Sequence, residues 1–108
     1  MESVKSYRDV ELKEEGIIPF LMDFRKVLEL YINKKINEEE LADFAIRTFV
    51  VNETLSDSIE KVEPGVLELR KAMDITHPDW NEEKRTNYIK DLIKLADKLI
   101  SKHFKKRG

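Results

Sequence analysis

Cysteine is absent from this chain of 108 residues, and glycine and proline occur only three times each. The absence of cysteine excludes a disulfide-stabilised scaffold, a zinc ribbon and a cysteine nucleophile. Few glycines and prolines argue against an all-β fold, because such folds need many tight turns. No apolar run approaches the ~18 residues of a membrane span, and residues 1–15 lack the apolar segment of a signal peptide. We therefore expect a cytoplasmic protein that has no membrane as a partner.

Charge is abundant but nearly balanced, with 20 Lys and Arg against 22 Asp and Glu and a formal net charge of −2. This balance argues against strong overall affinity for nucleic acid. It conceals an asymmetry, because residues 1–63 hold 15 acidic and 9 basic side chains, whereas residues 64–108 hold 7 acidic and 11 basic ones. The two parts of the chain therefore offer surfaces of opposite sign.

Apolar residues recur with the period of an α-helix over four segments, 18–35, 38–63, 66–76 and 80–104. Short connectors between such helices favour the packing of neighbours. The sequence therefore predicts an all-α fold, a small four-helix bundle that is largely antiparallel. We expect residues 1–16 to form an N-terminal arm or a short extra helix, and residues 17–108 to form a single helical-bundle domain. The predicted core consists of Phe20, Phe24, Leu28, Tyr31, Leu41, Phe44, Leu55, Ile59, Leu69, Leu92, Leu95 and Leu99.

The second segment has the clearest start, because Asn37 and Glu40 occupy the two positions of a capping box. Its apolar stripe stays in phase throughout, so we expect one continuous helix over residues 38–63. Asn52 lies within this stripe, where a buried asparagine would fix register or oligomeric state. Alternatively, Asn52 marks a helix end, because the Asn, Thr and Ser residues of 52–58 are poor helix formers.

The last segment is apolar on one side and basic on the other. Asp79 and Glu82 predict a capping box at its start. Its apolar residues, ending at Phe104, cover an arc of about 180°, whereas packing against one neighbour needs only ~100°. This helix therefore packs on two or more helices or forms a homo-oligomer interface. The basic face consists of Lys90, Lys94, Lys98, Lys102 and Lys105.

Two interpretations of this lysine face remain open. It is either a surface for phosphate groups or an acidic membrane, the former making the chain a nucleic-acid-associated protein, or a solvated face that Asp91 and Asp97 partly neutralise. The solvated face is favoured, because nucleic-acid surfaces usually add exposed aromatic or arginine side chains.

Acidic residues gather in two stretches and form the candidate partner-binding site. Such a cluster attracts a basic protein partner. Helix capping and the helix dipole are the alternative explanation for the second stretch, because acidic residues in a first turn are favourable there. The candidate residues are Glu11, Glu14, Glu15, Glu38, Glu39, Glu40 and Asp43.

Residues 28–44 contain a helix followed by the run Lys34-Lys35-Ile36-Asn37-Glu38-Glu39-Glu40-Leu41. This stretch, under a fifth of the chain, is similar to helical colicin-type immunity proteins. The similarity implies a protein that neutralises a basic toxin through its acidic side chains.

One pair of residues in the sequence matches a motif of a catalytic family. Arg70 and His77 resemble the Arg-x(4–6)-His motif of helical HEPN ribonucleases, and this resemblance implies an RNA-cleaving enzyme. The alternative is a capped turn between two helices that Trp80 anchors to the core. Neither histidine follows a glutamate by three residues, so the chain lacks the helical di-metal pattern. We expect no metal site and no cofactor.

The favoured hypothesis is a non-enzymatic helical protein-binding module, such as an adaptor or an immunity or antitoxin-like protein, that acts through charged helical surfaces, by self-association, or by both. Ile46 and Val50 lie off the apolar stripe of their helix and, with Phe49, predict an exposed apolar patch unless the N-terminal arm covers them. Nucleic-acid association through the lysine face is the second hypothesis, and a HEPN-like ribonuclease is the third.

Overall fold

The computed structural model describes residues 12–107 and contains only helices and connecting segments in that range. The helices are η1 (Glu14–Gly16), α2 (Ile17–Ile32), α3 (Glu38–Ile46), η2 (Arg47–Val51), α4 (Glu53–Val62), η3 (Pro64–Thr76) and α5 (Glu82–Arg107). The predicted all-α fold is therefore confirmed. Within the same residues, no helix is both long enough and apolar enough to cross a membrane.

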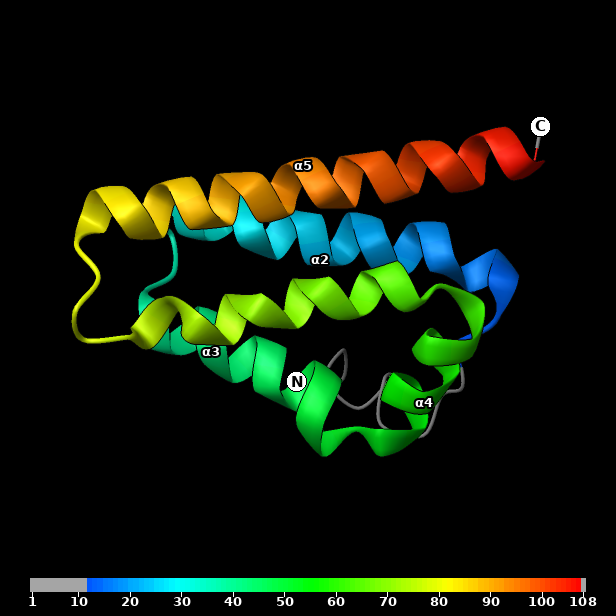
Figure 1. Ribbon diagram of the computed structural model, residues 1–108, viewed down its shortest axis with the longest axis horizontal. Coiled ribbons are helices and arrows are strands. Elements are labelled where there is room, and N and C mark those ends of the chain that lie inside the picture. Colours follow the sequence, from blue (N-terminus) through cyan, green and yellow to red (C-terminus); the bar gives the residue numbers. More distant parts are fainter. Residues whose placement is uncertain (1–11, 108) are drawn as a thin grey trace.

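Four long segments lie side by side and alternate in direction (Figure 1). Helix α2 packs along α5, and η3 packs against α3, α4 and α5. Helix α4 is a short piece at the end of the bundle where η3 begins. The molecule is 39 Å long, which is about the length of the 26 residues of α5 at 1.5 Å per residue. The predicted antiparallel bundle is thus present, with α4 as an additional short helix.

The core lies between α2, α3, η3 and α5. Ten of the twelve predicted core residues are buried, and Phe44 and Leu95 are half-buried at its edge. Phe49 inserts from η2 between Phe20 and Phe24, with ring centroids 6.5 and 5.4 Å away. These aromatic pairs add to the stability that area burial provides.

Helix α2 ends at Ile32, three residues earlier than the sequence pattern predicts. Lys34 adopts the left-handed conformation with φ 62°. The Lys35 backbone N–H donates to the Leu30 carbonyl and the Lys34 N–H to the Tyr31 carbonyl. This is the hydrogen-bond pattern of a Schellman motif, which usually carries glycine at the position of Lys34.

The predicted continuous helix over residues 38–63 is wrong, because the chain breaks at Asn52. The Asn52 backbone leaves the helical region, with φ −91° and ψ 83°, and its side-chain oxygen accepts a hydrogen bond of 3.2 Å from the Leu55 N–H. Asn52 thereby caps α4, which satisfies a backbone donor that a helix start leaves unpaired. Of the two roles considered for Asn52, the structure shows the helix end. The Asn37–Glu40 capping box at the start of α3 is present as predicted.

The third segment is a 3-10 helix of 13 residues, longer than the few residues usual for this type. With a rise of about 2.0 Å per residue, it spans about 26 Å, close to the length of about 24 Å that the 16 residues of α2 give. A stretched helix therefore lets a short segment run along most of the bundle.

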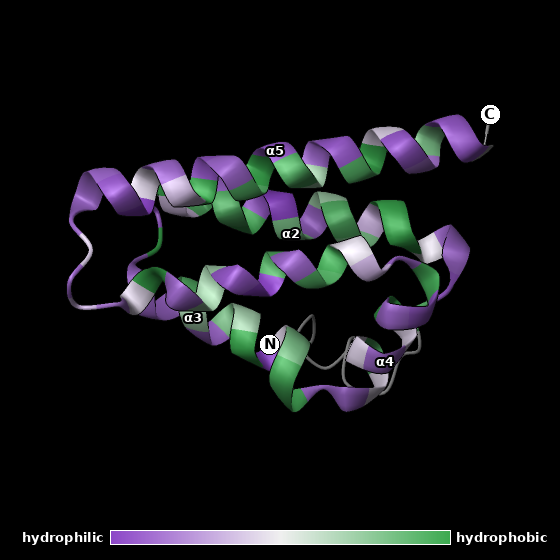
Figure 2. Cartoon of the chain, in the orientation of Figure 1, coloured by the Kyte–Doolittle hydropathy of each residue, from purple (hydrophilic) through white to green (hydrophobic). Residues whose placement is uncertain are grey.

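Helix α5 is capped two residues later than predicted, by Asn81 instead of Asp79. The Asn81 side chain accepts a 2.8 Å hydrogen bond from the Lys84 N–H, whereas the Asp79 N–H donates to His77 Nδ1. The proposed Asp79–Glu82 capping box is therefore wrong. Hydrophilic residues cover most of the outer side of α5, and apolar residues follow the side that faces α2 and η3 (Figure 2).

Candidate functional site

The outward side of α3 and η2 carries an unusual concentration of exposed apolar side chains. Among the described residues, five large hydrophobic side chains are exposed, and three of them lie within six consecutive positions. These are Ile46, Val50 and Val51, with exposed fractions of 39, 55 and 65%. The exposed carboxylates of Glu39 and Asp43 precede them on the same side of the helix. We call these five residues the α3–η2 face.

A π-helical turn positions the apolar end of this face. Over Arg47–Val51 the helix widens, and the Thr48 hydroxyl donates to the Phe44 carbonyl at 2.8 Å. Phe49 points into the aromatic core, whereas the two residues that follow it, Val50 and Val51, are exposed to solvent. The predicted exposure of Ile46 and Val50 is confirmed, whereas Phe49 is buried and does not belong to the patch. Such π turns occur frequently at functional sites.

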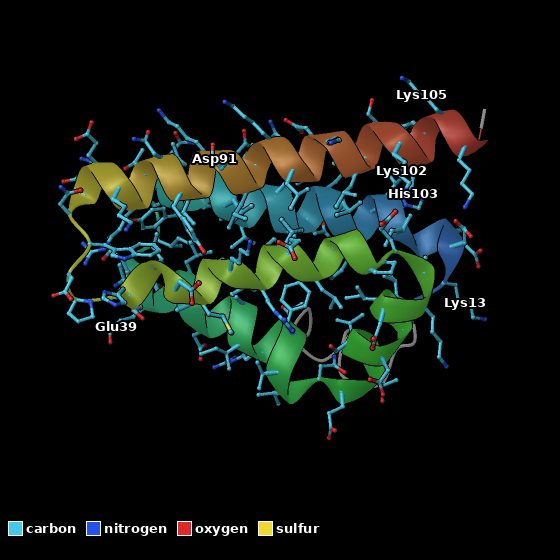
Figure 3. All side chains as sticks on the ribbon, in the orientation of Figure 1. Lys13, Glu39, Asp91, Lys102, His103 and Lys105 are labelled. Carbon is cyan, nitrogen blue, oxygen red and sulfur yellow. The ribbon has the colours of Figure 1, made fainter. Side chains whose placement is uncertain are left out.

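The acidic residues around α3 have different local roles. Glu38 accepts a hydrogen bond from the Tyr31 hydroxyl at 2.9 Å, and Glu40 closes the capping box with Asn37. Asp43 forms an exposed i,i+4 ion pair with Arg47 at 2.9 Å. Glu39 is exposed and has no hydrogen bond or ion pair with any residue in the range 12–107 (Figure 3). Capping therefore accounts for part of the cluster, and Glu39 is an exposed carboxylate without a partner among the described residues.

The two acidic stretches do not form one patch. Glu14 and Glu15 precede α2, whereas Glu38 to Asp43 follow it, and the 16 residues of α2 separate the two groups by about 24 Å. Glu14 instead faces the end of α5, where its carboxylate lies 3.3 Å from Lys106 Nζ. Glu11 lies outside the described residues.

The lysine face of α5 is changed by two contacts to other helices. Lys102 forms an ion pair of 2.8 Å with Glu63 at the start of η3. Asp97, expected to neutralise the lysines, turns toward α2 and accepts hydrogen bonds from Nε and Nη2 of Arg25. The other predicted lysines are exposed and, within the described part of the chain, have no carboxylate within ion-pair distance: Lys90, Lys94, Lys98 and Lys105.

A buried Glu63–His103 pair was not predicted from the sequence. The His103 ring lies 2.7 Å from Glu63 Oε1 through Nε2, and the two residues are 2 and 5% exposed. Burial alone would raise the pKa of Glu63, but hydrogen bonds from Lys102, His103 and the Gly65 N–H lower it below its ordinary value. Because an ionised carboxylate only accepts hydrogen bonds, His103 Nε2 carries the proton. The Glu63-Pro64-Gly65 run signals a helix boundary, but no local pattern links it to a histidine 40 residues later.

This buried pair connects three parts of the fold. Glu63 caps η3 through its hydrogen bond of 3.1 Å from the Gly65 N–H, and His103 belongs to the last turns of α5. The opposite ring nitrogen, His103 Nδ1, lies 3.8 Å from the Glu14 carboxylate of η1 (Figure 3). Because the ring is almost completely enclosed, a substrate has no access to it, and the arrangement fits a structural role.

The turn around His77 is held by aromatic and polar contacts. The His77 ring stacks on Trp80 with centroids 5.8 Å apart, and Arg85 donates to the carbonyl of Ile75 at 3.0 Å. Lys84 lies over the Trp80 ring at 4.6 Å. These contacts agree with the alternative interpretation as an anchored turn. In the described residues no group of three His, Asp or Glu side chains is placed to hold a metal ion.

Two tyrosines tie this end of the bundle together. Burial, with a hydrogen bond to Glu38, raises the pKa of Tyr31 to about 12. Burial, with a hydrogen bond to Asp74, raises the pKa of Tyr88 to about 12. Both hydroxyls therefore stay protonated near neutral pH and act as hydrogen-bond donors, not as bases.

No protein-family model matches the chain, and neither curated proteins nor solved structures give a significant match. The similarities of short stretches to immunity proteins and to HEPN ribonucleases therefore stay predictions. The fold and its surfaces are the basis for inference about function.

Proposed function

We propose that this protein is a non-enzymatic protein-binding module that engages its partner through the α3–η2 face. The observation that carries this proposal is the gathering of three exposed apolar side chains, Ile46, Val50 and Val51, beside the π-helical turn. Apolar side chains grouped on a surface and bordered by polar ones are typical of protein interaction sites. Burying them against a partner would contribute about 25 cal/mol for each Å² of apolar surface removed from water.

The chemistry of the face indicates the kind of partner. Glu39 and Asp43 extend the apolar end toward the start of α3, so a segment with apolar side chains followed by Lys or Arg fits along it. A partner of this kind agrees with an immunity or antitoxin-like role against a basic toxin. Self-association through the same face is less favourable, because it brings two copies of one surface together and the five residues of this face include no basic side chain to pair with Glu39 and Asp43.

A charge substitution at the centre of the face tests the proposal. Val50→Arg removes an apolar contact and adds a charge that repels a basic partner. The tagged full chain is used to capture proteins from cells of its source, and binding of each captured protein is then measured with purified components by calorimetry. We expect Val50→Arg and Glu39→Arg each to weaken binding of the partner at least tenfold.

Met22→Arg is the matched control. Met22 is 54% exposed, a fraction similar to that of Val50. It lies about 200° around α2 from Phe20, and the ring of Phe20 contacts Phe49. It therefore points away from the α3–η2 face, and its substitution should leave binding unchanged. Equal loss of binding in Met22→Arg and Val50→Arg, or unchanged binding in both, would contradict the proposal.

A further inference from the structure

Four free lysines follow one side of α5. Lys90, Lys94 and Lys98 are each separated by four residues, a rise of about 6 Å per step, and Lys105 continues the row, so that it spans about 22 Å. All four are exposed and have no carboxylate partner among the described residues. Residues 82–107 contain nine Lys and Arg against four Asp and Glu, a net charge of +5 in a chain whose total is −2.

The packing of α5 keeps this charge accessible. Arg25 of α2 binds Asp97 at the edge of the row. Of the lysines of α5, only Lys102 forms an ion pair with Glu63 in the described residues. Between Lys90 and Lys105, Asp91 is then the one remaining carboxylate of α5. In the described residues, neither aspartate forms an ion pair with any of the four lysines.

Phe104 is an exposed aromatic side chain near these lysines. The sequence pattern had placed it on the apolar side of α5. It is 59% exposed and directly precedes Lys105 near the end of the row. Aromatic side chains beside a line of positive charge are the common elements of single-strand nucleic-acid sites, where bases stack on the rings and lysines follow the phosphates.

A membrane surface fits this face less well than a nucleic acid. A helix that lies in a membrane interface inserts its apolar side between the lipids. The apolar side of α5, including Ile89, Leu92 and Leu99, is buried in the core of the protein, so that only Phe104 would enter a bilayer.

We propose that the four lysines and Phe104 form a binding surface for single-stranded nucleic acid, which holds the phosphates without base preference and stacks one base on Phe104. The surface is independent of the α3–η2 face, because α2 and η3 lie between α3 and α5 (Figure 1).

Fluorescence anisotropy with labelled 20-nucleotide oligo-dT and oligo-U tests this surface in the full chain. Each neutralised phosphate of a single strand contributes about −0.7 to the slope of log K against log salt, so four lysines give about −2.8. Affinity should then fall about 50-fold between 50 and 200 mM salt. Lys94→Glu/Lys98→Glu should halve the slope, and Phe104→Ala should weaken binding about fivefold or more, because it loses a stacked base.

Lys26→Glu/Lys61→Glu is the matched control, since it changes the net charge equally at exposed positions of α2 and α4. This control should keep the slope of the unchanged protein, with helix content verified by circular dichroism. The proposal is overturned by absence of binding at 50 mM salt, by equal loss in the control, by tighter binding to a 20-base-pair duplex, or by binding confined to vesicles that contain phosphatidylserine.

Discussion

Replacing Glu63 by alanine removes the centre of the buried polar cluster. The Glu63 carboxylate accepts hydrogen bonds from His103 at 2.7 Å, from Lys102 at 2.8 Å and from the Gly65 N–H at 3.1 Å. Loss of one partner from a buried charge pair costs roughly 3–5 kcal/mol. The Lys102 side chain is 59% exposed and is free to turn toward water, so we expect a loss of about 2–4 kcal/mol, mainly from the enclosed His103 ring.

Thermal and urea denaturation followed by circular dichroism measure this loss. For a domain of about 100 residues, 1 kcal/mol corresponds to a Tm shift of about 4 °C, so Glu63→Ala should lower Tm by roughly 8–16 °C. Glu60→Ala is the matched control, because Glu60 is exposed in the last turn of α4, three residues before Glu63. Its effect should stay within about 0.5 kcal/mol, as for other surface substitutions.

A double-mutant cycle separates the pair from its surroundings. If Glu63 and His103 act together, the double variant Glu63→Ala/His103→Ala loses less free energy of unfolding than the sum of the two single variants. A loss in Glu63→Ala no larger than in Glu60→Ala, or strict additivity in the cycle, would refute the structural role assigned to the buried pair.

Three further predictions concern local features. Lys34→Gly should raise the free energy of unfolding by about 1 kcal/mol relative to Lys34→Ala, because both remove the exposed contact with Glu82 but only glycine relieves the left-handed conformation at φ 62°; equal Tm values would contradict this. Asn52→Ala should lower stability by about 1 kcal/mol through loss of the α4 cap, whereas Thr54→Ala, exposed on α4, should change little. The pKa of folded Glu63 lies below its ordinary value of 4.5, so its contribution is present above that pH and is lost as the pH falls through the lower folded value. Urea denaturation from pH 7 to pH 3 should therefore show a steeper decline for the unchanged protein than for Glu63→Ala, and parallel curves would exclude this origin.

Local signals in the sequence predicted much of the helical framework. Asn37 and Glu40 form the predicted capping box because both partners lie within one turn. The core residues follow from helical periodicity, which is set by the same local geometry. In contrast, the apolar stripe of residues 38–63 stays in phase across Asn52 and therefore predicts one helix. In the structure the chain breaks at Asn52, and the helices before and after it run in different directions (Figure 1).

Other features of the surfaces depend on contacts between distant residues, which local sequence patterns do not reveal. The pairing of Glu63 with His103 and of Arg25 with Asp97 joins positions 40 and 72 residues apart. Phe104 fits the apolar arc of its helix but lies beyond the partners that cover that arc, which leaves it exposed. Likewise, the two acidic stretches were predicted to form one site, but α2 runs between them and places them at opposite ends of the bundle.

Photocrosslinking from position 50 tests the central claim most directly. A photoreactive amino acid replaces Val50 in the full chain, and a second protein carries it at Met22, which is similarly exposed. We predict a covalent adduct with one protein from position 50, absent from position 22, whose yield falls when Glu39→Arg is added. Adducts that are the same from both positions, or that are unaffected by Glu39→Arg, would contradict a binding site on the α3–η2 face.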